Sequence, residues 1–121
     1  MKKRVLVVDD SATDRQLATS LLQKQGYSVI AAVDGEDALE KIAAEPPPLV
    51  VLDIILPRMN GYQVLRQLKS SPETKDIKVI LVSSKGQDSD RYWGLKQGAD
   101  DYIAKPYPDD VLLSAVAKHL Q

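Results

Sequence analysis

Five short apolar runs recur along the chain, and longer segments with helical spacing separate them. The runs are residues 5–8 (VLVV), 28–32 (SVIAA), 49–55 (LVVLDII), 79–84 (VILVSS) and 101–104 (DYIA). Three of these runs are continuously apolar rather than alternating, as expected for strands that are covered on both faces. A regular alternation of strand and helix predicts an α/β fold, in which a parallel sheet carries helices on both sides.

The segments between the runs place apolar residues three or four positions apart, as amphipathic helices do. Their apolar sets are Leu17, Leu21 and Leu22; Ala38, Leu39 and Ile42; Val64, Leu65 and Leu68; and Val111, Leu112, Ala115, Val116 and Leu120. Residues 88–97 predict a further, less apolar helix, in which we expect Trp93 to pack into the core. Close packing is expected at Gly94, since glycine costs about 1 kcal/mol in a helix.

Strand order follows from connection rules, because crossovers between parallel strands are right-handed and leave few topologies. The chain lacks a glycine-rich dinucleotide loop after its first run. We therefore predict a flavodoxin-like, doubly wound sheet with strand order 2-1-3-4-5 and five helices.

Composition limits the classes of function. A length of 121 residues predicts one domain over residues 1–121, with no effector domain. Sixteen basic and 17 acidic residues leave no positive excess for binding nucleic acid. The absence of cysteine excludes disulfides and thiolate chemistry. No apolar stretch is long enough to span a membrane, so we expect a cytoplasmic protein without membrane insertion.

Polar residues stand where the predicted strands end. In open parallel sheets, ligands bind beyond the carboxyl ends of the strands. Asp9 and Asp10 follow the first run, Asp53 lies near the end of the third, Ser83 near the end of the fourth, and Lys105 follows the fifth. Adjacent acids after a strand can simply cap the next helix, as Asp10 could. Three carboxylates in one pocket repel one another unless a cation is present, and oxygen ligands suit Mg²⁺.

The combined set indicates phosphoryl chemistry. One carboxylate would attack phosphorus and form an acyl phosphate. Magnesium and the lysine would stabilise charge that develops on the phosphoryl oxygens, and the serine hydroxyl would donate a hydrogen bond to them.

Four strings, VLVVDDS, LVVLDIILPRMNG, VILVSS and GADDYIAKP, resemble the receiver domain of two-component response regulators. The resemblance runs from Arg4 to Leu120. It implies that a histidine kinase transfers a phosphoryl group to Asp53. It also implies that Asp10, Asp53 and the backbone carbonyl of Ile55 bind Mg²⁺ directly, with Asp9 acting mainly through water.

The same resemblance assigns the switch residues. Ser83 matches the hydroxyl residue that follows the phosphoryl group, and Lys105 matches the pairing lysine, whose bond to Pro106 is expected to be cis. Tyr102 matches the aromatic residue that changes rotamer on activation. The alternative interpretation is that Tyr102 is an ordinary, half-buried aromatic residue of the strand. The expected partner surface is formed by the fourth helix, the fifth strand and the fifth helix, with these residues facing it: Arg91, Leu95, Tyr102, Ala104 and Ala115.

Two positions differ from the best-known chemotaxis receiver. Ile55 places an apolar side chain where a polar one could orient water, and Lys85 stands where an acid could stand. Both positions flank the expected route of the hydrolytic water. We therefore predict slow self-dephosphorylation.

The resemblance implies a stand-alone signalling protein that is not an enzyme, apart from catalysing its own phosphorylation and dephosphorylation. Its expected partners are a histidine kinase and a downstream target protein, and it is expected to be a monomer or weak dimer. Residues 91–102 (RYWGLKQGADDY) look similar to stand-alone receivers of twitching-motility and phototaxis systems, which control type IV pili.

Three rival classes fit the sequence less well. Phosphatases of the haloacid dehalogenase type need an Asp-x-Asp arrangement and usually a cap domain. A flavin-binding electron carrier needs a phosphate loop after the first strand. A phosphate-independent binding module would not need the intact set of Asp10, Asp53, Ser83 and Lys105.

Overall fold

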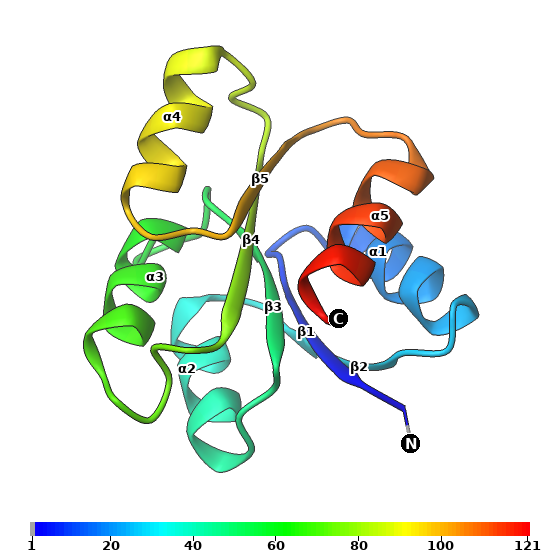
Figure 1. Cartoon of the computed structure of the whole chain (residues 1–121), viewed down its shortest axis with the longest axis horizontal. Coiled ribbons are helices and arrows are strands. Elements are labelled where there is room, and N and C mark those ends of the chain that lie inside the picture. Colours follow the sequence, from blue (N-terminus) through cyan, green and yellow to red (C-terminus); the bar gives the residue numbers. More distant parts are fainter. Residues whose placement is uncertain (1) are drawn as a thin grey trace.

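The computed structural model describes residues 2–121, in which five strands and five helices alternate along the chain (Figure 1). The strands are β1 Arg4–Val8, β2 Ser28–Ala32, β3 Leu49–Asp53, β4 Lys78–Ser83 and β5 Asp101–Ala104. The helices are α1 Ala12–Lys24, α2 Gly35–Ala44, α3 Gly61–Ser70, α4 Asp88–Lys96 and α5 Asp109–His119. All strand pairings are parallel and the order is β2-β1-β3-β4-β5, which confirms the predicted topology.

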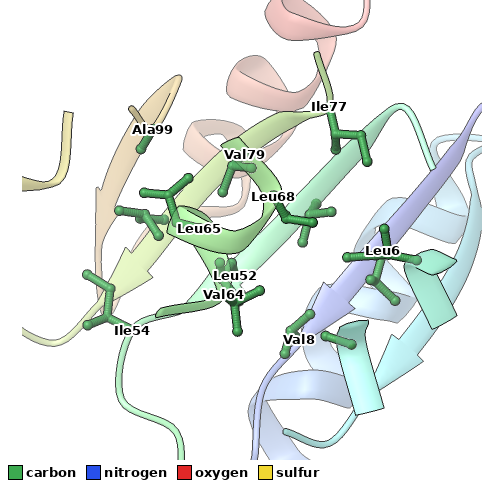
Figure 2. Packing of buried hydrophobic residues seen from close by; sticks show 14 of the residues in the cluster. Leu6, Val8, Leu52, Ile54, Val64, Leu65, Leu68, Ile77, Val79 and Ala99 are labelled. Atoms are coloured by element: carbon green, nitrogen blue, oxygen red, sulfur yellow. The ribbon is translucent and has the colours of Figure 1, made fainter. Parts of the chain in front are cut away.

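The helices form two layers, one on each side of the sheet. Successive strand residues face opposite sides, so Val5 and Val7 pack toward α1 and α5, whereas Leu6 and Val8 pack toward α2 and α3. Figure 1 shows α1 and α5 together on one side of the strands, with α2, α3 and α4 on the other. Figure 2 shows the buried cluster on the side of α2 and α3, in which side chains of β1 and β3 meet those of α3. Both faces of the sheet are therefore buried, as the continuous apolar runs predicted.

Side-chain caps fix where several helices begin. The Ser11 hydroxyl accepts a hydrogen bond from the Asp14 backbone N–H at 3.2 Å, so α1 begins directly after the acidic pair. Asn60 and Gln63 form a reciprocal capping box at the start of α3. The longest helix, α1, has 13 residues. None of the helices between residues 2 and 121 combines the length and hydropathy needed to cross a lipid bilayer.

Strand β3 ends at Asp53, two residues earlier than the apolar run suggested. The Ile55 backbone N–H donates to the Asp53 carboxylate at 3.1 Å, and the Gly61 N–H donates to the Ile54 carbonyl at 2.8 Å. These bonds turn the chain out of the sheet. A Cβ at Gly61 would lie 2.4 Å from the Asp53 carbonyl oxygen, so the start of α3 approaches the strand end as only glycine permits.

Three apolar residues do not lie where helical spacing suggested. The expectation that Trp93 packs into the core is wrong, because 51% of its surface is exposed. Leu17 and Val111 are also exposed. In α4 the buried position is taken by Gly94, where an added Cβ would lie 2.7 Å from the Tyr102 ring. The close packing expected at Gly94 is confirmed.

Candidate functional site

Three carboxylates meet at the carboxyl edge of the sheet. One oxygen from each of Asp9, Asp10 and Asp53 can be chosen so that all three lie within 4.8 Å of one another. Asp9 and Asp53 are buried, whereas Asp10 is exposed. Because β1 and β3 are neighbours in the sheet, residues that lie 43 or more positions apart in the sequence converge here.

Local hydrogen bonds hold the two buried carboxylates. One oxygen of Asp9 accepts the Ser11 backbone N–H at 2.9 Å. One oxygen of Asp53 accepts the Ile55 N–H at 3.1 Å. Each acid thus accepts from the residue two positions ahead, an arrangement that short polar side chains make where a strand turns into a loop. Both acids retain oxygen lone pairs for a further partner.

Lys105 lies between three acids, of which one follows β1, one belongs to α1 and one ends β3. It follows β5, and the bond to Pro106 is cis, as expected. Its ammonium Nζ lies 2.8 Å from Asp9, 3.1 Å from Asp14 and 3.1 Å from Asp53. Burial alone lowers the pKa of Lys105, but hydrogen bonds to these carboxylates outweigh burial and raise that pKa above its ordinary value. Lys105 is therefore a permanent positive charge at neutral pH.

One lysine does not neutralise the cluster. Burial raises the pKa of Asp53 above its ordinary value, despite opposing hydrogen bonding and charge attraction from Lys105, and the Asp9 charge raises it further. The cluster therefore contains more carboxylates than ammonium groups, and its carboxylate oxygens, which can act as metal ligands, lie close together. This donor set suits a hard divalent cation such as Mg²⁺, which binds through one or two carboxylates and keeps several waters.

Ser83 at the end of β4 and Tyr102 in β5 lie on neighbouring strands. Ser83 is buried, and its hydroxyl accepts the Lys85 backbone N–H at 3.1 Å. Tyr102 is only 2% exposed, and its hydroxyl donates to the Lys85 carbonyl at 2.5 Å. Tyr102 is thus buried rather than half-buried. Both side chains therefore contact the backbone of the same residue, Lys85.

The expected partner surface combines exposed and buried residues. Arg91, Leu95 and Ala104 are exposed, whereas Tyr102 and Ala115 are buried. Arg91 joins α4 to β5, because its guanidinium donates to the Tyr102 carbonyl at 3.0 Å. The α5 helix also contributes exposed side chains, because Val111, Ser114 and Lys118 line the same groove as Arg91 and Ala104.

Sequence reasoning missed Asp14. The residue is in the first turn of α1, where an acid ordinarily signals only a favourable interaction with the helix dipole. It also lines a groove of about 500 Å³ beside α1, together with Leu17, Lys105, Tyr107 and Asp109 among others. The sequence offered only one indication that Asp14 belongs to the site. Asp14 lies three residues after Ser11, and so about one helical turn from the acidic pair.

Comparison with known proteins agrees with this geometry. A sequence model described as the response regulator receiver domain matches residues 5–117. Protein PilH of Pseudomonas aeruginosa is 42% identical over 113 residues, which are 93% of each chain. Protein PilG of the same organism is 42% identical over 117 residues, covering 97% of this chain and 87% of PilG. The crystal structure of a putative response regulator from Chloroflexus aurantiacus superposes with a TM-score of 0.95 at 31% identity, covering 99% and 98% of the two chains.

Proposed function

Because the chain belongs to the response regulator receiver domain family, we propose that it accepts a phosphoryl group on Asp53 from a histidine kinase. Members of this family are signalling proteins rather than classical enzymes. The observation that carries the proposal is the position of Asp53, which is buried beside two further carboxylates and 3.1 Å from the Lys105 ammonium.

In the proposed transfer, an Asp53 carboxylate oxygen attacks the phosphorus of a phosphohistidine. The new O–P bond forms as the N–P bond breaks, and the imidazole leaves with the electron pair. Lys105 keeps its proton throughout and stabilises the negative charge on the phosphoryl oxygens. Water later cleaves the acyl phosphate and restores the carboxylate.

Asp10, Asp53 and the backbone carbonyl of Ile55 are the proposed direct ligands of Mg²⁺, with Asp9 acting mainly through water. When bound, the ion neutralises charge that develops on the transferring phosphoryl group. The excess of buried carboxylate over ammonium supports this assignment. Asp9 and Asp53 also retain acceptor capacity beyond the backbone bonds that orient them.

Phosphorylation is proposed to change the face made by α4, β5 and α5. A phosphoryl group adds roughly one and a half to two negative charges and three acceptor oxygens, which would attract the Ser83 hydroxyl. Ser83 and Tyr102 both contact the backbone of Lys85. A shift of the loop at Lys85 would therefore change the position of the Tyr102 side chain. The exposed Arg91, Leu95 and Ala104, with the buried Tyr102 and Ala115 behind them, form the proposed surface for a downstream target.

The proposed setting is a cytoplasmic signalling pathway of the twitching-motility or phototaxis type, acting on type IV pili. Residues 91–102 carried this resemblance, and the similarity to PilH and PilG along most of the chain supports it. The proposed form is a stand-alone receiver, monomeric or weakly dimeric, that neither binds nucleic acid nor inserts into a membrane.

Intact-mass analysis after incubation with acetyl phosphate and Mg²⁺ tests the chemistry. We expect a single phosphoryl adduct on the wild-type protein and none on Asp53→Asn. The matched control is Asp10→Asn, which keeps the acceptor but loses a proposed ligand, so its adduct should need more Mg²⁺. A folded wild-type protein that gains no adduct at any Mg²⁺ concentration would instead be a phosphate-independent binding module.

A further inference from the structure

Asp14 is the acid at this site that the phosphoryl chemistry has not yet used. Its carboxylate lies 3.1 Å from Lys105 Nζ, although the two residues are 91 positions apart in the chain. We propose that Asp14 is a positioning residue that holds Lys105 in the unphosphorylated protein and releases it when a phosphoryl group arrives. This inference rests on the proposed phosphorylation of Asp53 and adds a residue that sets the availability of the lysine.

The number of hydrogen-bond donors on Lys105 limits how many acceptors it can bind at once. An ammonium group has three N–H donors. In this structure its three acceptors are Asp9, Asp14 and Asp53, at 2.8, 3.1 and 3.1 Å. Every donor therefore has a carboxylate partner. If Asp53 keeps its own bond to Lys105, a phosphoryl oxygen on Asp53 can bind the ammonium only when the bond to Asp9 or to Asp14 is given up.

Asp9 and Asp14 remain carboxylates after the transfer, and burial decides which of their two bonds to Lys105 is released. The side chains of Asp9 and Asp53 are only 8% and 9% exposed, whereas that of Asp14 is 45% exposed. A buried carboxylate that loses its partner is left without compensation, while an exposed carboxylate is solvated by water. The bond to Asp14 is therefore the one that breaks most readily.

The backbone of Asp14 is fixed independently of the lysine. Its N–H donates to the Ser11 hydroxyl, which caps α1. The release therefore needs only a change in side-chain rotamer. One N–H···O bond to Asp14 breaks, one N–H···O bond to a phosphoryl oxygen forms, and Lys105 stays protonated throughout.

The rate of phosphorylation by acetyl phosphate at saturating Mg²⁺ tests this role. We expect Asp14→Asn to raise the rate about two- to fivefold, the effect of a partly exposed ion pair. Loss of a negative charge near the site could also raise the rate without involving Lys105. The matched control is therefore Asp109→Asn, because Asp109 lines the same groove but forms no ion pair with Lys105 in the described chain.

A Lys105→Gln background makes the test specific. If Asp14 acts through the ammonium, Asp14→Asn should leave the residual rate of the Lys105→Gln protein unchanged. An equal acceleration by Asp14→Asn and Asp109→Asn, or an acceleration that persists in the Lys105→Gln background, would overturn the proposal.

A second readout does not depend on phosphorylation. In the unphosphorylated protein, the ¹⁵N resonance of the Lys105 ammonium should shift or broaden in Asp14→Asn and stay unchanged in Asp109→Asn. An unchanged resonance in Asp14→Asn would refute the positioning role even if wild-type phosphorylation is normal. A protein that takes no phosphoryl group but shows the resonance change would refute the proposed function and leave the contact between Asp14 and Lys105 established.

Discussion

Replacing Gly94 with alanine tests how α4 packs against the switch aromatic. Gly94 lies inside α4, and its backbone is covered by the ring of Tyr102. An added Cβ would lie 2.7 Å and 3.1 Å from two ring carbons of Tyr102, and 3.2 Å from a methyl carbon of Leu81. The nearest distance is shorter than real side-chain contacts allow, so either the ring or the helix must move.

Two opposing effects set the magnitude. Alanine gains about 1 kcal/mol over glycine in helix propensity. Overpacking of a tightly filled site costs about 1–3 kcal/mol. We therefore expect Gly94→Ala to lower the free energy of unfolding by up to about 2 kcal/mol. In a Tyr102→Ala background the ring is gone and the propensity gain should dominate, so Gly94→Ala should then be stabilising.

Urea unfolding followed by circular dichroism measures both effects in one double-mutant cycle. The expected coupling between Gly94 and Tyr102 is about 1–3 kcal/mol, the size of the relieved clash. The Tyr102→Ala protein, which loses a large buried side chain, must first be shown to be folded. The reasoning would be refuted if Gly94→Ala changed stability by the same amount, and with the same sign, in both backgrounds.

Three further predictions follow from the site and its surroundings. Asp53→Asn should stabilise the protein by about 1–2 kcal/mol at pH 7 without divalent cations, because burial of the Asp53 charge, together with repulsion from the neighbouring carboxylates, outweighs the attraction to Lys105 at 3.1 Å. Because the folded-state pKa of Asp53 is raised, this advantage should vanish as the pH falls below the ordinary pKa of an aspartate, and thermal unfolding across pH would show it. Ile55→Asn should shorten the lifetime of the phosphoryl group several-fold, since an amide can orient water where an exposed apolar side chain cannot; an unchanged decay in intact-mass time courses would contradict this. Asn60→Ala should lower the free energy of unfolding by about 1 kcal/mol through loss of the α3 cap, and an effect below about 0.3 kcal/mol in urea would rule out a contribution from this cap.

The order of elements and the strand order of the sheet could be predicted from sequence because their causes are local. Continuous apolar runs such as 5–8 and 49–52 have the composition that a strand buried on both faces requires. Handedness rules then leave few ways to connect five such strands. The convergence of Asp9, Asp53 and Lys105 followed in turn, because the carboxyl ends of parallel strands share one edge.

Helix faces were harder to predict, because a short helix has few turns over which the apolar spacing can be read. In α4 the sequence offered Trp93 as the core residue, yet the buried position is Gly94. The reason lies in β5, whose Tyr102 ring fills the space that a helix side chain would otherwise take. Nothing within residues 88–97 encodes that neighbour.

The sequence by itself determined the fold and which strand ends carry carboxylates, since both depend on periodicity and on connections between adjacent elements. Only the tertiary structure decided that Lys105 has a third acidic partner, Asp14, and that the Tyr102 hydroxyl reaches the Lys85 carbonyl. These contacts join residues 91 and 17 positions apart. They depend on where α1 and the loop after β4 lie relative to the edge of the sheet. Packing of the whole domain sets these positions, and no local sequence pattern does.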